Sequence, residues 1–369
     1  MKILISGGGT GGHIFPALSI ANALRRRKPD TEILFVGALG RMEMERVPAA
    51  GYEIVGLPVA GFDRRRPWRN FRVLAKLWKS MRLARKVLKD FRPDACVGVG
   101  GYASGPMLKE AQKRGIPTLL QEQNSYAGVT NKLLAKKARA ICVAYDGMER
   151  FFPAEAITLT GNPVRHEIAT ASAPREEAKK ELGFDAGRPL VVVVGGSLGA
   201  RTINEAMIES FGAILETGAS VLWQTGKLYS ERCQAETAPI VEKYGADRVQ
   251  VVPFVGRMDL VYRAADVMVS RAGASTISEI QLTGVPSILV PSPNVAEDHQ
   301  RKNAEALSDR GAAVTLLDRD CRDQLADTVE KLLASPAQLR SLGENAKAMA
   351  LPDADEKIVD ALLKLVQHP

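Results

Sequence analysis

The sequence is poor in cysteine and has no long apolar run, and each absence excludes a class of protein. Cysteines without a CxxC spacing favour reduced, buried thiols in a cytosolic protein over a disulfide framework or a zinc site. Apolar runs such as residues 190–194 are far too short to cross a bilayer. No apolar stretch with a cleavage site follows Met1, so we expect no signal peptide. The four cysteines are scattered through the 369 residues: Cys96, Cys142, Cys233 and Cys321.

Acidic residues are nearly absent from one segment, residues 62–92. It holds twelve Lys or Arg against Asp63 and Asp90, which gives a net charge of +10. Because the whole chain carries +8, the remaining residues sum to −2. Charge concentrated in this way predicts one docking face rather than a general affinity for polyanions.

Short apolar segments alternate with longer helical patterns along the whole chain. Continuous Val, Ile and Leu runs predict parallel strands that are covered on both faces, and the alternation predicts an α/β fold with right-handed crossovers. We expect strands at residues 2–6, 32–36, 94–99, 116–120, 139–144, 189–194, 219–224, 248–254, 265–270 and 286–291.

The chain also repeats its own opening. "ILISGGGTGGH" near residue 3 is echoed by "VVVVGGSLGA" near residue 191, which predicts two Rossmann-like domains, residues 1–161 and 162–349. The join is expected within "LTGNPVRHEI", where Gly161 and Pro163 interrupt the pattern. A ligand would then lie in a cleft between the domains, beyond the carboxyl ends of the strands. The final segment, about residues 350–369, reads as a helix that could pack on either domain.

Three glycine-rich turns follow predicted strands: "GGGTGGH" (7–13), "GVGGYASGP" (98–106) and "GGSLGA" (195–200). The first matches G-x-G-x-x-G, but no carboxylate ends the second strand and no Gly-Lys-Ser/Thr follows. What remains is a set of backbone N–H groups suited to an anion. A tight turn that binds nothing is the alternative, which unused glycine entropy disfavours. Three such turns suit two phosphate-bearing ligands.

Several polar residues of the second half could bind a nucleotide sugar. Glu279 lies within two turns of a helix start at Gly273, where a carboxylate can accept hydrogen bonds from both ribose hydroxyls; it could equally face solvent. Gln300 could bond sugar hydroxyls or cap a helix. Arg165 could be a cation for a phosphate or an ordinary surface residue.

Seven motifs occur together in the order seen in one family: "GGGTGGHIFPAL", "GVGGYASGP", "EQNSYAGVTNK", "GNPVR", "GGSLGA", "SRAGASTISE" and "EDHQRKNA". They span about residues 3–304, and the chain thereby resembles the MurG family of peptidoglycan N-acetylglucosaminyltransferases. The resemblance implies the GT-B fold, two Rossmann-like parallel-sheet domains facing across a cleft. It also implies inverting transfer of GlcNAc from UDP-GlcNAc to the 4-hydroxyl of MurNAc in undecaprenyl-pyrophosphoryl-MurNAc-pentapeptide, at the cytoplasmic face of the bacterial inner membrane.

The resemblance also assigns roles residue by residue. Glu279 matches the ribose ligand, Ser197 and Arg165 match donor phosphate contacts, and Val255 lies where a backbone group reads uracil. The full set expected to bind the donor is Thr10, Gly11, Gly12, Asn124, Arg165, Ser197, Val255, Ala274, Thr276, Glu279 and Gln300. The set expected around the acceptor diphosphate is Gly8, Gly9, His13, Gly101, Tyr102 and Ser104.

An inverting transfer needs a base for the acceptor hydroxyl, and His13 is our first choice because imidazole titrates near neutrality. Its alternative role is to bond the acceptor phosphates, and Glu122 is the second candidate base. We expect no cofactor and no catalytic metal. The nominal DxD motifs at 318–320 and 353–355 read as turn and capping residues far from the glycine turns.

The basic segment is amphipathic from Trp68 onward. An ordinary crossover helix, with its apolar face on the sheet, explains part of it. That reading leaves the aromatic residues and the Arg triplet 64–66 unexplained, whereas anionic lipid headgroups favour such a surface. No nucleic-acid recognition motif is found. The residues expected at the membrane are Trp68, Phe71, Leu74 and Trp78.

Three rival functions fit parts of the pattern. Two are enzymes of the same fold that use UDP-sugars, a diacylglycerol glycosyltransferase and a UDP-GlcNAc 2-epimerase. The third is a binding module for a nucleotide sugar or dinucleotide, without catalysis.

Overall fold

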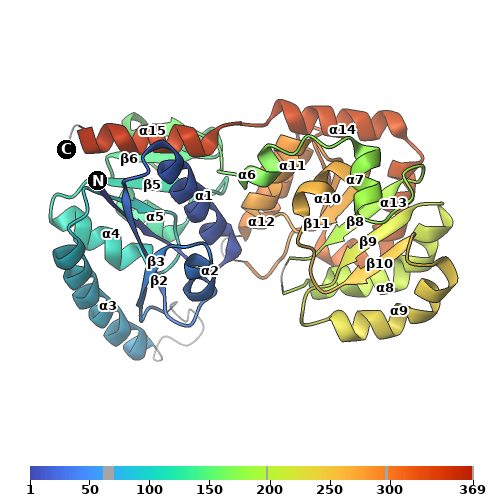
Figure 1. The fold of residues 1–369 in the computed structure, drawn as a ribbon, viewed down its shortest axis with the longest axis horizontal. Coiled ribbons are helices and arrows are strands. Elements are labelled where there is room, and N and C mark those ends of the chain that lie inside the picture. The colour runs from blue at the N-terminus through green and yellow to red at the C-terminus, as the bar shows by residue number, and fades with distance from the viewer. Residues whose placement is uncertain (61–69, 197, 296–297, 368–369) are drawn as a thin grey trace. The chain divides into compact units, whose positions relative to one another are not determined.

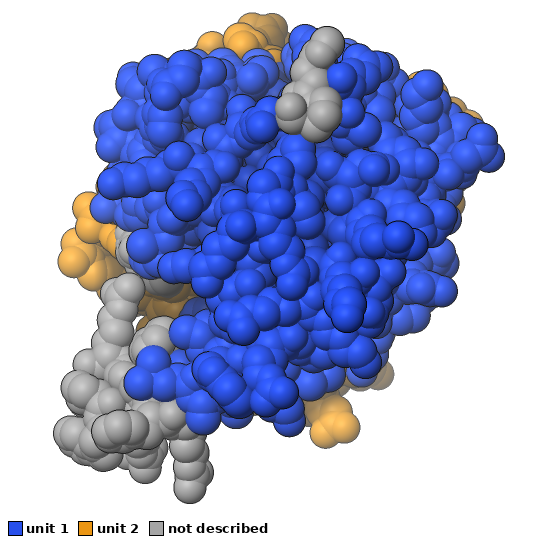
Figure 2. Space-filling view, turned by 90° about the vertical axis from the view of Figure 1, so that its left-hand side faces the viewer, with its two compact units in different colours: residues 1–165, 351–369 blue, residues 166–350 orange. Residues whose placement is uncertain are grey.

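The computed structural model describes residues 1–60, 70–196, 198–295 and 298–367. The chain divides into two compact units (Figures 1 and 2). Unit 1 comprises residues 1–165 and 351–369, and unit 2 comprises residues 166–350. Each unit contains one sheet, and every strand pair among the described residues is parallel.

The sheet of unit 1 has the order β3-β2-β1-β4-β5-β6-β7. Its central strands are nearly free of exposed residues because helices cover both faces. The strands are β1 (Lys2–Ser6), β2 (Glu32–Ala38), β3 (Glu53–Leu57), β4 (Ala95–Gly98), β5 (Thr118–Glu122), β6 (Ala140–Val143) and β7 (Ile157–Leu159).

Alternate residues of this sheet point into two separate cores. Ile3 and Ile5 of β1 pack with α1 (Gly11–Arg27) and α15 (Ala354–Gln367), while Leu4 packs on the opposite face. That opposite core is built with α3 (Asn70–Phe91), α4 (Ser104–Lys113) and α5 (Val129–Ala135). Among the described residues, the unit also contains α2 (Glu43–Ala49) and the 3₁₀ turns η2 (Met148–Arg150) and η3 (Ala154–Ala156).

The C-terminal helix α15 belongs to unit 1 (Figure 1). Its residues Ile358, Val359 and Leu362 are buried in the core that α1 shares. Ion pairs reinforce the contact, since Arg26 of α1 bonds Asp355 at 2.9 Å. The segment that sequence left open between two domains therefore completes the first one.

The sheet of unit 2 has the order β10-β9-β8-β11-β12-β13. Its strands are β8 (Leu190–Val194), β9 (Ser220–Gln224), β10 (Val249–Val252), β11 (Val267–Ser270), β12 (Ser287–Leu289) and β13 (Val314–Thr315). Its helices are α6 (His166–Ala169), α7 (Arg175–Glu181), α8 (Arg201–Glu216), α9 (Ser230–Tyr244), α10 (Met258–Ala264), α11 (Ala274–Thr283), α12 (His299–Ser308), η5 (Asp318–Asp320), α13 (Cys321–Leu333) and α14 (Pro336–Ala348).

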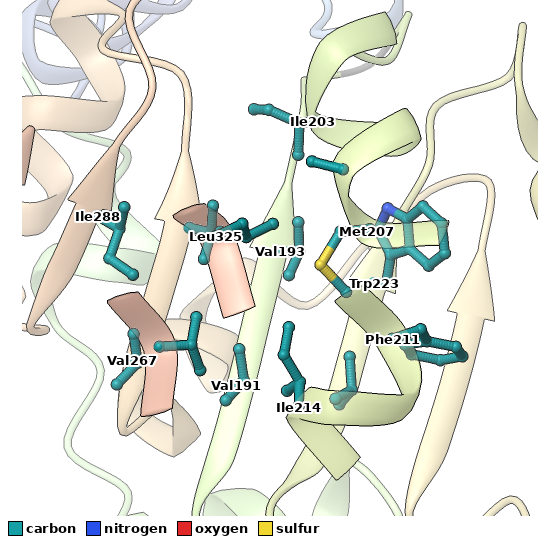
Figure 3. Packing of buried hydrophobic residues seen from close by; sticks show 14 of the residues in the cluster. Val191, Val193, Ile203, Met207, Phe211, Ile214, Trp223, Val267, Ile288 and Leu325 are labelled. Atoms are coloured by element: carbon teal, nitrogen blue, oxygen red, sulfur yellow. The ribbon is translucent and has the colours of Figure 1, made fainter. Parts of the chain in front are cut away.

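One core of unit 2 lies between the sheet and helices α8 and α13 (Figure 3). Val191 and Val193 of β8 face Met207 and Phe211 of α8, and Trp223 of β9 stacks edge-on against Phe211 at 5.7 Å between ring centroids. The buried Trp223 indole donates to Asn204 Oδ1 at 3.1 Å, so its polar atom is satisfied.

The predicted α/β class and parallel strands are confirmed, and each predicted strand has a counterpart. Three strands were not predicted, namely β3, β7 and β13, and each lies at a sheet edge. All four cysteines are buried and unpaired, as expected. None of the described helices is both long and apolar enough to span a bilayer.

Candidate active site

In each sheet the chain first adds strands on one side of its first strand and then on the other side. The point where it changes sides, the reversal point, lies between two neighbouring parallel strands. These pairs are β1 and β4 in unit 1, and β8 and β11 in unit 2. A doubly wound sheet opens a crevice for ligands at this position, beyond the carboxyl ends of the strands. The glycine turns 7–12 and 98–101 follow β1 and β4, and the turn 195–200 follows β8. Sequence therefore placed the turns where such sheets bind ligands.

The two glycine turns of unit 1 touch each other. A Cβ on Gly101 would overlap the carbonyl oxygen of Gly8, and a Cβ on Gly7 would overlap the Val99 side chain. Gly8 has φ +143° and Gly101 has φ +82°, conformations that side chains other than glycine rarely adopt. These glycines are thus required by close packing of turn against turn, whereas a Cβ on Gly9 would meet no atom within 4 Å.

A buried carboxylate, Glu43, holds the first glycine turn through hydrogen bonds. Its two oxygens each lie 3.0 Å from the Gly9 amide nitrogen, which donates to them, and Oε1 also accepts from Ala38 N at 2.9 Å. A Cβ on Gly8 or on Gly37 would overlap the Glu43 side chain. Glu43 is only 1% exposed, so it is a structural anchor of the turn rather than a surface residue.

The sequence pattern did not point to Glu43, because a carboxylate was expected on the second strand itself and not on the helix that follows it. The signal was an acidic residue in the first turn of the next helix, α2, five residues after β2 ends. The Gly9 N–H was expected to face the acceptor diphosphate, but in this structure it donates to Glu43. The remaining amides of the turn stay candidates for that role.

His13 lies in the first turn of α1, beside the second glycine turn. Its Nδ1 is 3.2 Å from the Thr10 hydroxyl oxygen, and its Nε2 packs against Gly100, where an added Cβ would approach to 2.9 Å. When Nδ1–H donates to Thr10, Nε2 carries the lone pair that a base needs. Thr10 and Gly100 together fix the ring at the point where the two turns meet.

Glu122 ends β5 and is 2% exposed. Its carboxylate accepts from Gly128 N at 3.0 Å, Asn131 Nδ2 at 2.9 Å and Asn124 N at 3.1 Å. Burial raises the pKa of Glu122, while these hydrogen bonds oppose the rise. With its oxygens engaged by loop amides, Glu122 holds Asn124 and the loop in place, which favours a positioning role over that of a base.

Two other residues expected at the acceptor differ in exposure. Tyr102 is 56% exposed and lies in the turn before α4. Ser104 is fully buried, and its hydroxyl lies 2.6 Å from Ser6 O and 2.8 Å from Gly100 O. The Ser104 side chain thus links β1 to the second glycine turn. Only the backbone N–H of Ser104 is left as a candidate contact to the acceptor diphosphate.

The glycine turn of unit 2 is supported by a residue that sequence reasoning missed, Gln224 at the end of β9. Its Nε2 donates to Gly196 O at 3.1 Å, and its Oε1 accepts from Val255 N at 2.9 Å. Because the Val255 N–H is engaged by Gln224, its carbonyl oxygen is the backbone group left for the expected contact to uracil. A polar residue closing an otherwise apolar strand, "SVLWQ", was the available signal.

Helix α11 begins beside this turn, after β11. Gly273 is its N-cap, with Ala274 and Thr276 in the first turn and Glu279 in the second. Glu279 is 6% exposed, which excludes the alternative of a solvent-facing glutamate. Gln300, in α12, accepts from Ser292 N at 2.9 Å through Oε1, so an expected contact to sugar hydroxyls falls to its Nε2 group.

Asp318 of the first nominal DxD motif is engaged by protein groups. Its Oδ1 accepts from Arg271 Nη1 at 2.5 Å and its Oδ2 from Thr202 Oγ1 at 2.9 Å. The expectation that this motif lies far from the glycine turns is wrong, since Thr202 is two residues past the turn 195–200. In the second motif Asp355 bonds Arg26. Across the described residues, no three His, Cys, Asp or Glu side chains gather as metal ligands.

Arg165 ends unit 1, and its guanidinium lies over the Phe15 ring at 5.6 Å. Of the residues expected to bind the donor, Thr10, Gly11, Gly12, Asn124 and Arg165 belong to unit 1 and the others to unit 2. Ser197, Trp68 and the side chain of Phe71 lie outside what the structure describes.

Comparisons with known proteins decide the family. Residues 3–143 match the glycosyltransferase family 28 N-terminal domain, and residues 190–358 match the glycosyltransferase family 28 C-terminal domain. A protein of Porphyromonas gingivalis is 54% identical over 369 residues, all of this chain and 96% of that protein. Its name is UDP-N-acetylglucosamine--N-acetylmuramyl-(pentapeptide) pyrophosphoryl-undecaprenol N-acetylglucosamine transferase. The chain belongs to the MurG family of glycosyltransferases.

Two further matches agree with this membership. A protein of the same name from Phocaeicola vulgatus is 55% identical over 365 residues, covering 99% of this chain and 96% of that protein. The crystal structure of MurG from Acinetobacter baumannii superposes with a TM-score of 0.74 at 28% identity, covering 98% and 99% of the two chains. The expected GT-B fold of the MurG family is therefore confirmed.

Proposed function

We propose that this chain transfers GlcNAc from UDP-GlcNAc to the 4-hydroxyl of MurNAc on undecaprenyl-pyrophosphoryl-MurNAc-pentapeptide, as a step of peptidoglycan synthesis. The observation that carries this proposal is the presence of glycine turns at the reversal point of both sheets. Two diphosphate esters need two such sets of backbone amides. The relatives, which match along nearly their whole length, are named for a reaction between two pyrophosphate esters.

Unit 2 supplies the donor side of the proposed site. The turn 195–200, with Ser197, and the first turn of α11, with Ala274 and Thr276, present N–H groups to the UDP phosphates. The Val255 carbonyl reads uracil, and buried Glu279 accepts from the ribose hydroxyls. Gln300 is proposed to bond the GlcNAc hydroxyls. The residues of unit 1 expected at the donor are Thr10, Gly11, Gly12, Asn124 and Arg165.

Unit 1 supplies the acceptor side. The turns 7–12 and 98–101 touch each other at Gly8 and Gly101. We propose that the amides of Gly8, Gly101, Tyr102 and Ser104 together face one anion. The diphosphate of the lipid acceptor binds these amides. Because Glu43 occupies the Gly9 N–H, that residue lets the acceptor approach closely rather than donating to it.

The reaction is a single in-line displacement. His13 Nε2 takes the proton from the MurNAc 4-hydroxyl, the new C–O bond forms at the anomeric carbon, and the bond to the UDP phosphate breaks on the opposite face. Backbone amides of unit 2 and Arg165 stabilise the charge that grows on the β-phosphate. Since these groups supply the stabilisation, we propose that neither a metal nor another cofactor takes part.

The membrane face is proposed on α3. Leu74, Leu77 and Trp78 are 51%, 36% and 62% exposed, so they do not pack on the sheet. Exposed basic residues lie among them, and the Arg82 guanidinium stacks over Trp78 at 4.9 Å. The sheet-facing part of α3 is instead its later half, with Ala84, Val87 and Leu88 buried. An exposed apolar and basic stripe fits an anionic headgroup layer at the cytoplasmic face of the inner membrane.

The function is tested by product analysis. The full chain is incubated with UDP-GlcNAc and a short-chain lipid-linked MurNAc-pentapeptide, and the acceptor is followed by mass spectrometry. We expect the acceptor to gain the mass of one N-acetylhexosamine. An acceptor of unchanged mass, with protein that is folded and binds UDP, would overturn the proposal.

A further inference from the structure

The ribose-binding carboxylate proposed above is itself held by a neighbouring side chain. Tyr262 of α10 donates its phenol hydrogen to Glu279 Oε2, and the two oxygens are 2.8 Å apart. Tyr262 is 4% exposed and Glu279 is 6% exposed, so the pair is buried between α10 and α11. Nothing in the pattern of the sequence pointed to this tyrosine, because the two residues are 17 positions apart.

The backbone of Glu279 is also fixed. It lies within α11, and the hydroxyl of Thr283 donates to the Glu279 carbonyl at 2.7 Å. The freedom left to Glu279 is therefore that of its side chain, whose rotation the phenol restricts. A carboxylate ordered before its ligand arrives loses less conformational entropy on binding.

We propose that Tyr262 is a positioning residue that sets the selectivity of the site for ribose over deoxyribose. This inference depends on the proposed function, in which Glu279 accepts hydrogen bonds from the ribose. A carboxylate can accept from the 2′- and 3′-hydroxyls of ribose together only when its plane has the correct orientation. The Tyr262 hydrogen bond fixes that plane. A 2′-deoxynucleotide offers one hydroxyl and gains little from the orientation.

The test compares the binding of two probes, UDP and 2′-deoxy-UDP, to the full chain by calorimetry. The variants are Tyr262→Phe, which removes only the phenol oxygen, and Tyr244→Phe, a half-buried tyrosine of α9 in the same unit. For the unaltered chain we expect UDP to bind about tenfold more tightly than 2′-deoxy-UDP. In Tyr262→Phe, UDP affinity should fall about 3- to 10-fold with 2′-deoxy-UDP nearly unchanged. Tyr244→Phe should keep both affinities.

A purely structural role for Tyr262 predicts a different pattern, in which both probes weaken equally and their ratio stays constant. That result, or an unchanged ratio at full affinity, overturns the inference while leaving the proposed function standing. If the unaltered chain binds neither probe, the proposed donor site fails and this inference fails with it. A double variant tests whether Tyr262 acts through Glu279. In a Glu279→Gln background, Tyr262→Phe should change the ratio no further, and an additional change would contradict the assignment.

Discussion

Removing the Glu43 carboxylate should destabilise unit 1 and disable the first glycine turn together. In Glu43→Ala, the amides of Gly9 and Ala38 lose their acceptor. Ala38 is buried, and an unsatisfied buried N–H costs about 1 to 3 kcal/mol. Gly9 is partly exposed, so water can replace part of its bond. The whole change should cost about 2 to 4 kcal/mol of folding free energy.

The assay is thermal unfolding with Glu45→Ala as the matched control. Glu45 lies in the same first turn of α2 but is exposed, so its loss should cost less than about 1 kcal/mol. In a unit of this size each kcal/mol shifts Tm by about 2 to 4 °C, which separates the two variants. Glu43→Gln keeps an oxygen for both amides and should fall between them.

Turnover provides the second readout, because the turn carries Thr10 and His13 at its end. A displacement of about 1 Å can lower a rate by about 100-fold. We expect kcat of Glu43→Ala to fall by about 10- to 100-fold. UDP affinity should fall much less, because the residues proposed to contact uracil and ribose, Val255 and Glu279, lie in unit 2. If Glu43→Ala melts and turns over like Glu45→Ala, Glu43 does not hold the turn and the reasoning is refuted.

Three further predictions follow from the same geometry. Burial raises the pKa of Glu122, so its contribution to stability is complete below the unfolded pKa of about 4.3 and is lost as pH rises through the raised pKa of the folded state. Glu122→Gln should therefore flatten the decline of the urea-unfolding free energy with rising pH. An unaltered decline would argue against a raised pKa for Glu122. His13→Ala should lose kcat by at least about 100-fold with donor affinity kept, and full turnover in a folded variant would remove His13 from the mechanism. Trp78→Ala should weaken salt-sensitive binding to anionic vesicles more than Leu228→Ala, whose side chain in unit 2 is apolar and even more exposed, at 72% against 62%. Equal binding of both variants, or equal binding to neutral vesicles, would contradict the membrane face.

The interior of both sheets could be predicted from sequence because buried parallel strands are continuous apolar runs. "LVVVV" of β8 is such a run, and it pairs on both sides. The missed strands lie at the edges, where one side carries no partner strand. β7 is a three-residue strand with two exposed residues, and β13 has only two residues. Such segments form because a neighbouring strand offers hydrogen bonds, which no local pattern records.

The glycine turns could be located from sequence, and the reversal points of the sheets explain their positions. The residues that support the turns could not. Glu43 lies 34 positions from Gly9, and Gln224 lies 31 positions from Val255. These contacts depend on how β2 and β9 are placed beside their neighbours. For the same reason the sequence could not show that Asp318 lies near a glycine turn, since 116 positions separate it from Thr202, which it contacts.

The most direct test of the central claim is UDP release from UDP-GlcNAc, measured in matched incubations with and without the lipid-linked acceptor analogue. The account predicts that UDP release rises at least about tenfold with the acceptor and matches the amount of GlcNAc transferred. Equal UDP release in both incubations, with an epimerised sugar and no glycosylated acceptor, would contradict it.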